Sequence, residues 1–157
     1  MSTFDVLIFI QNSAIAHAVS KSNHLVGAGL QIFHVLGFVL LLASLVLINL
    51  RLLGLAFNSY SLPQLSREAG RLIWGGLALA VLSGALMFAA SPTLYYYKPI
   101  FLYKIGLLVL AVVLQVLLYK RVVASESPSP LLARGTVAFS LVLWFGVGLA
   151  GRAIGFV

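Results

Sequence analysis

The sequence contains no cysteine and very little acid, and each shortage excludes a class of protein. Without cysteine the chain has no disulfide, thiolate metal ligand or iron–sulfur cluster. Three Asp and Glu residues stand against ten Lys and Arg in 157 residues, and charged residues make up 8% of the chain. A soluble domain usually carries about 25% charged residues to cover its surface. The composition therefore excludes an ordinary water-soluble globule.

Long apolar runs are abundant instead, and 62% of the residues are hydrophobic. A membrane-spanning helix needs about 20 apolar residues to cross about 30 Å of hydrocarbon. Four segments meet this requirement: residues 23–50, 71–90, 101–119 and 134–156. We therefore predict an all-α integral membrane protein, a four-helix bundle that forms one transmembrane domain over residues 1–157.

The segment ahead of the first span, residues 4–19, is shorter and is interrupted by polar side chains such as Asp5, Gln11 and His17. It predicts an N-terminal interfacial helix that lies among the lipid headgroups, with residues 20–23 turning into the first span. A shallow re-entrant helix is the alternative.

Basic residues are distributed unevenly between the two sides of the predicted bundle. The first and third connections carry six of them, Arg51, Arg67, Arg71, Lys120, Arg121 and Arg134. Basic loops favour the cytoplasm, so we predict a multi-pass protein of the bacterial inner membrane with both termini in the periplasm. The net charge of +7 suits anionic lipid headgroups rather than nucleic acid.

The first span carries a polar stripe. At about 100° per residue, His24, Gln31 and His34 lie within about 80° of one another. Polar groups are costly in lipid, so the stripe is predicted to face the bundle interior. Gly27 and Gly37 would let a flat ligand approach closely. The pattern favours a haem b or quinone site, and the alternative is a hydrogen bond from His34 to a neighbouring helix.

Helix geometry limits the haem interpretation. His24 and His34 are ten positions apart, about 15 Å of rise, so both cannot ligate one iron. A second ligand would have to be His17, reached through the turn, or would come from a partner chain; otherwise the iron is five-coordinate.

Two basic residues are predicted at the same end as this stripe. Lys104 opens the third span, and Arg152 interrupts a run of small residues late in the fourth. Both could hold haem propionates, a quinone carbonyl or a lipid phosphate. Alternatively both extend their charges into the headgroup region.

Two further features suggest packing and metal binding. Small residues such as Gly84 and Gly151 predict close helix contacts, and Gln115 predicts a hydrogen bond across the bundle. A soft copper site is a weaker possibility; its ligands would be His17, His24, Met1 and Met87.

Two short motifs carry a resemblance. The run His34-Val35-Leu36-Gly37, followed by Asn49-Leu50-Arg51-Leu52-Leu53-Gly54, resembles a family of small bacterial membrane proteins that is distantly like the membrane domain of CopD-type copper-resistance proteins. Lys104 and the pair Gly151-Arg152 continue the pattern. The resemblance implies four membrane helices and makes His34, Lys104 and Arg152 site candidates. It also implies Asp at the position of Asn49, and without that Asp no ion pair with Arg51 can form.

These observations favour a haem b- or quinone-binding electron-transfer subunit that works with a periplasmic or membrane redox partner. Such a chain is not an enzyme alone, although it fits a membrane subunit of an oxidoreductase. An accessory subunit of a larger membrane complex, or a homo-oligomer, is the alternative, and a copper-handling protein is weaker. A proton-coupled transporter is disfavoured because Asp5, Glu68 and Glu126 all lie outside the predicted spans.

Overall fold

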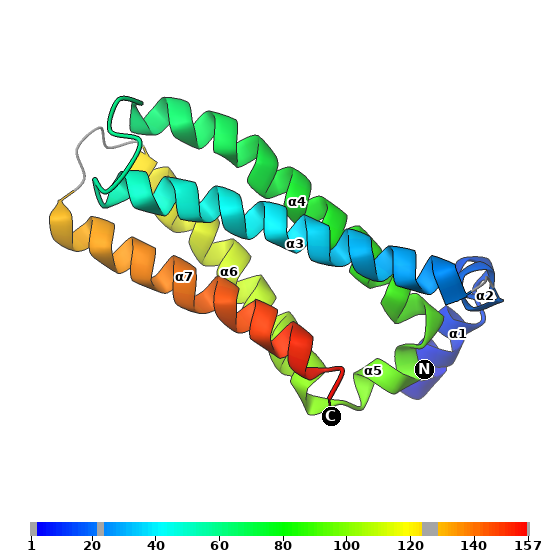
Figure 1. Cartoon of the computed structure of the whole chain (residues 1–157). Helices are drawn as coiled ribbons and strands as arrows, with labels where there is room; N and C mark the ends of the chain where they lie inside the picture. Colours follow the sequence, from blue (N-terminus) through cyan, green and yellow to red (C-terminus); the bar gives the residue numbers. More distant parts are fainter. Residues whose placement is uncertain (1–2, 22–23, 124–128, 157) are drawn as a thin grey trace.

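The computed structural model describes residues 3–21, 24–123 and 129–156 (Figure 1). These residues form seven helices and no strand: α1 (Thr3–Gln11), α2 (Ala14–Lys21), α3 (His24–Leu52), α4 (Leu62–Ala90), α5 (Pro92–Tyr96), α6 (Pro99–Val123) and α7 (Pro130–Ala153). Four of them, α3, α4, α6 and α7, are long and apolar enough to cross a membrane. The predicted all-α bundle with four candidate membrane spans is confirmed.

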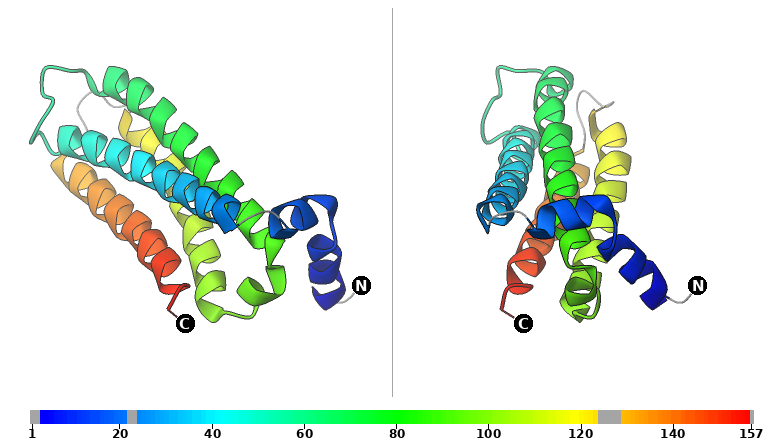
Figure 2. Two further views of the ribbon diagram at one scale, coloured as in Figure 1. Left: turned by 45° about the vertical axis from the view of Figure 1, so that its right-hand side comes forward. Right: turned by 90° about the vertical axis from the view of Figure 1, so that its right-hand side faces the viewer.

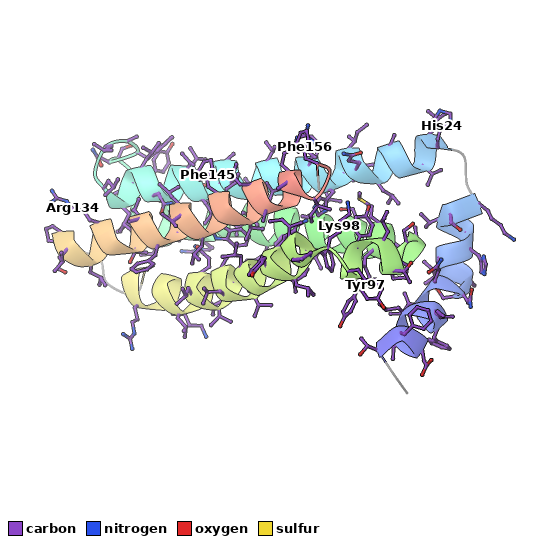
Figure 3. All side chains as sticks on the ribbon, turned by 90° about the horizontal axis from the view of Figure 1, so that it is seen from below. His24, Tyr97, Lys98, Arg134, Phe145 and Phe156 are labelled. Atoms are coloured by element: carbon purple, nitrogen blue, oxygen red, sulfur yellow. The ribbon has the colours of Figure 1, made fainter. Side chains whose placement is uncertain are left out.

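The four long helices form two antiparallel pairs, α3 with α4 and α6 with α7 (Figure 1). Contacts of α3 with α7 and of α4 with α6 join the pairs. The short helices α1, α2 and α5 lie at the same end of the bundle as the C-terminus, and we call this the α5 end. Arg134 lies at the opposite end, and His24 lies at the α5 end (Figure 3).

Large apolar side chains cover the outside of the spans. Val142 and Leu149 on α7 are each 70% exposed, and Phe139 is 62% exposed. Water would reject such a surface, whereas lipid hydrocarbon solvates it. The chain is therefore a multi-pass membrane protein whose helices contact the bilayer.

Two glycines allow α3 and α4 to touch through their backbones. A Cβ atom added to Gly37 would lie 2.7 Å from both the Ala80 nitrogen and the Gly76 oxygen. One added to Gly76 would lie 2.6 Å from the Gly37 oxygen. Only residues without a side chain fit such a crossing. This contact fixes the register of α3 against α4.

Gln115 on α6 confirms the predicted hydrogen bond across the bundle. Its Oε1 accepts from Ser140 Oγ at 3.2 Å and from Trp144 Nε1 at 3.3 Å, both on α7. Trp144 is 2% exposed and packs with Leu41 and Leu45 of α3 in the apolar core. The polar end of a buried indole needs such a partner.

The N-terminal segment differs from the single helix expected over residues 4–19. It forms α1 and α2, which break at residues 12–13, where Ser13 Oγ accepts from the Ala16 backbone N–H at 3.2 Å. A serine that caps a helix in this way starts a new one. Figure 2 shows α1 and α2 beyond the end of the bundle, and α2 packs on α4. The expected turn at Ser22 and Asn23 lies outside the described residues.

Two spans also begin earlier than expected because proline and serine start them. Helix α4 begins at Leu62 rather than near residue 71, since Ser61 caps its first turn and Pro63 lies within that turn. Helix α7 begins at Pro130 rather than 134, with Ser129 as its cap, and ends at Ala153 rather than 156. Proline suits a first turn, where its missing N–H has no helical partner anyway.

Candidate functional site

His34 lies on α3 with its imidazole directed toward α4, and it is half-buried. Its Nδ1 is 2.6 Å from the Ala80 carbonyl oxygen and 3.3 Å from Ser83 Oγ. Ser83 donates its own proton to the Leu79 carbonyl at 2.6 Å. Because a carbonyl oxygen only accepts, Nδ1 carries the proton, and Nε2 of the neutral ring is left with a free lone pair.

Gly84 makes room for this imidazole. A Cβ atom at Gly84 would lie 2.9 Å from Cε1 and 3.1 Å from Nδ1 of His34. The ring thus packs directly against the backbone of α4, which holds it in one orientation. A side chain at position 84 would displace it.

Lys104 on α6 brings a positive charge to the exposed lone pair. Its Nζ lies 3.4 Å from His34 Nε2, and the lysine is half-buried. Gly151 on α7 gives space to the lysine stem, since a Cβ there would lie 3.3 Å from both Cε and Nζ of Lys104. An ammonium only donates, so Nε2 accepts. All four long helices therefore contribute to one imidazole–ammonium pair.

Aromatic side chains gather near this pair. Phe88 of α4 and Phe101 of α6 are stacked, with ring centroids 5.2 Å apart and an interplanar angle of 4°. Tyr95 of α5 lies 5.9 Å from Phe101 and 6.5 Å from Phe88 between centroids. Phe38, one turn from His34 on α3, packs against Gly148 of α7, where a Cβ would lie 2.7 Å from its Cε1.

The rest of the predicted polar stripe does not face the interior. His24 and Gln31 are exposed, as is Gly27, so the interior orientation is correct for His34 and wrong for the other two polar side chains. The contact of Phe38 with Gly148 places the end of α7 about level with residue 33 of α3. The outer turns of α3 therefore extend beyond α7, which leaves Gln31 and His24 uncovered.

Three other predicted site residues also lie apart from the pair. Arg152 is exposed and places its guanidinium over the Phe156 ring, 4.4 Å from the centroid, while its neighbour Gly151 faces Lys104. His17 is exposed on α2. Gly37 serves the α3–α4 crossing rather than a ligand. Of the eight predicted cofactor-binding residues, the structure brings together His34 and Lys104.

The suggested copper ligands do not form a visible cluster. Met1 lies outside the described residues, and His17 and His24 are exposed. Across residues 3–21, 24–123 and 129–156, no three His, Asp or Glu side chains come close enough to hold a metal ion together. Haem needs no such cluster, and neither does a site of two histidines and two methionines.

Ser83, Gly84 and the aromatic residues Phe88, Tyr95 and Phe101 were not predicted as parts of a site. Gly84 and Gly151 were predicted to allow close helix contacts, and this is confirmed. Gly84 packs against His34, and Gly151 packs against Lys104. The alignment of α4 with α3 brings Ser83 and Gly84 beside His34, and no local pattern encodes that alignment.

Asn49 and Arg51 lie near the C-terminal end of α3. It is 6% exposed, and among the described atoms its Nδ2 has no hydrogen-bond partner. Arg51 donates from Nε to the Tyr60 carbonyl at 2.7 Å. The guanidinium therefore secures the loop after α3.

Comparisons with protein-family models, curated proteins and solved structures find no match to this chain. The fold and the site alone define its class: a four-helix membrane protein with a half-buried imidazole–ammonium pair near the α5 end. Such a pair could offer a ligand the remaining N–H donors of the ammonium, and the Nε2 lone pair once Lys104 turns away from it.

Proposed function

We propose that this chain is a membrane-embedded electron-transfer subunit that holds a quinone or haem b at His34 and Lys104. It would exchange electrons with a periplasmic or membrane redox partner. The observation that supports this most is the arrangement of His34: Ala80 holds its Nδ1, so that Nε2 points at the Lys104 ammonium inside the bundle. A purely structural histidine needs only the first of these contacts.

The pair fits the oxygen atoms of a quinone and quinol. Lys104 can donate to a carbonyl oxygen, and His34 Nε2 can accept the proton of a hydroxyl. Oxidation of a quinol releases two protons and two electrons, and the redox partner would take the electrons. Nε2 of His34 would take one of the two protons once Lys104 turns from it to the quinone oxygen, and the second proton would pass to water at the α5 end. The anchored Nδ1 keeps Nε2 in place for this transfer.

Haem b is the second candidate, and the same anchor favours it. A histidine that ligates a metal through one nitrogen usually donates its other N–H to a carbonyl or carboxylate, as Nδ1 of His34 does to Ala80. His24 is about 15 Å away in rise and is exposed, so the iron would be five-coordinate or would take its second ligand from another chain.

An accessory subunit without a cofactor is the alternative function. The contacts of His34 with Ala80 and Lys104 link α3 to α4 and α6. Interhelical hydrogen bonds of this kind stabilise membrane bundles by roughly 1 kcal/mol each.

The location and orientation also belong to the proposal. Basic side chains such as Arg67, Arg71 and Arg134 are exposed at the end opposite α5. We place that end in the cytoplasm of a bacterium, with both termini in the periplasm. The distant resemblance to CopD-type membrane domains is part of the same proposal; His34, Lys104 and Gly151 from its motifs lie together at the site.

Purified full-length protein from bacterial membranes tests this function. Absorbance spectra before and after dithionite reduction would detect haem, and organic extraction with chromatography would detect quinone. We expect one of the two in the native protein and its loss in His34→Ala, with His24→Ala as the matched control. If native protein carries neither and binds neither when each is added, the accessory-subunit function replaces this one.

A further inference from the structure

The aromatic trio Phe88, Tyr95 and Phe101 lies on the α5 side of the imidazole–ammonium pair. Phe88 follows Gly84 by four positions on α4, and Phe101 precedes Lys104 by three on α6, so each shares a helix face with a site residue. Both rings therefore lie about one turn, roughly 5 Å, farther toward the α5 end. All three aromatic residues are half-buried.

The opposite side of the pair is closed by Phe38. Its ring is one turn beyond His34 on α3 and packs against Gly148, which lies one turn from Gly151 on α7. Beyond it begins the apolar core around Leu41. Phe38 and this core therefore separate Nε2 and Nζ from the bundle centre, and the α5 end is the side left for a ligand.

We infer that the ligand of this site is a quinone rather than haem, and that Phe88, Tyr95 and Phe101 form the wall on which its ring stacks. This inference rests on the proposed function and names its ligand class, a planar para-quinone. Lys104 donates to one carbonyl oxygen of the quinone, while the ring lies against an aromatic face. In the quinol, the hydroxyl at that position donates to Nε2 of His34. Stacking of aromatic rings adds attraction beyond the area that they bury.

The position of Lys104 beside Nε2 favours a quinone over haem. Lys104 Nζ lies 3.4 Å from Nε2, in the direction from which iron would have to approach. Gly84 contacts the imidazole on one side, and Gly151 confines the lysine on another. Iron at Nε2 would have to displace Lys104 from it, whereas a quinone oxygen would bind to Lys104 itself.

Binding of decylubiquinone, a short-tailed benzoquinone, to the purified full-length protein in detergent tests the inference. Phe101→Leu and Phe88→Leu keep apolar volume but remove the aromatic face. We expect each to weaken binding about threefold to tenfold, and Phe101→Tyr to retain the affinity of the native protein. Phe139→Leu, at a lipid-facing position of α7, is the matched control and should leave binding unchanged. Melting temperatures identify any variant that fails to fold.

Several outcomes separate this inference from the function on which it rests. If His34→Ala abolishes quinone binding but Phe101→Leu behaves like Phe139→Leu, the aromatic wall is wrong and the quinone function stands. A Soret band that depends on His34, in protein that binds no quinone, overturns the inference and leaves a haem subunit. Absence of both ligands overturns inference and function together.

Discussion

Lys104 Nζ lies 3.4 Å from His34 Nε2, and this contact joins α6 to α3 across the boundary between the two helical pairs. A charged donor and a lone pair meet here inside an apolar bundle. Intramembrane ionisable residues are costly and commonly mark functional sites. The first two predictions concern this contact.

Replacing Lys104 by Met should weaken quinone binding more than tenfold, because the donor to the carbonyl oxygen is lost while the stem volume remains. Titration with decylubiquinone measures this effect. Lys98→Met is the control, since Lys98 Nζ donates to the Ile154 carbonyl at 3.1 Å instead. Equal affinity in native protein and Lys104→Met would show that the lysine has no part in binding.

Gly151→Ala and Gly84→Ala should displace Lys104 and His34 respectively, because each new Cβ would lie about 3 Å from the neighbouring side chain. We expect ligand binding to fall in Gly84→Ala, and to fall less in Gly151→Ala, because the flexible lysine stem can shift more easily than the imidazole ring. Gly151→Leu and Gly84→Leu should in addition impair folding or assembly, as judged by expression and by migration in detergent. The matched control is Gly135→Ala on α7, where a Cβ meets nothing within 4 Å. Leucine variants that migrate like the parent would contradict the close packing.

Gly37→Ala and Gly76→Ala should destabilise the protein by about 1–3 kcal/mol, since both added Cβ atoms would collide with the backbone of the facing helix. Thermal unfolding in detergent measures the change. Gly75→Ala, beside Gly76 but in open space, should be neutral or slightly stabilising. A similar loss in all three variants would mean that helix contact is not the cause.

Reporter fusions test the orientation. Alkaline phosphatase fused at Ser129 should be inactive, and the same reporter at the C-terminus should be active, because the basic connections are expected in the cytoplasm. Activity at Ser129 with none at the C-terminus would reverse the orientation without changing the number of spans.

The sequence by itself determined the four spans, although we expected α4 and α7 to begin later than they do. Apolar runs long enough to cross a bilayer leave few other folds open. Lipid offers no hydrogen-bond partner to backbone N–H and C=O groups, and a helix pairs these groups within itself. The starts at Ser61 and Ser129 follow from local capping by serine next to proline. The break at Ser13 is equally local, although we expected a continuous helix there.

Only the tertiary structure decided which polar residues form a site. On α3 alone, Gln31 and His34 lie on one stripe, and the helical pattern predicts an interior position for both. The Gly37–Gly76 crossing sets the register that brings Gly84 beside His34, and α7 ends too early to cover Gln31. Contacts between segments far apart in the chain fix the register of α4 against α3 and the level at which α7 ends beside α3. Helical periodicity within one segment carries no information about either.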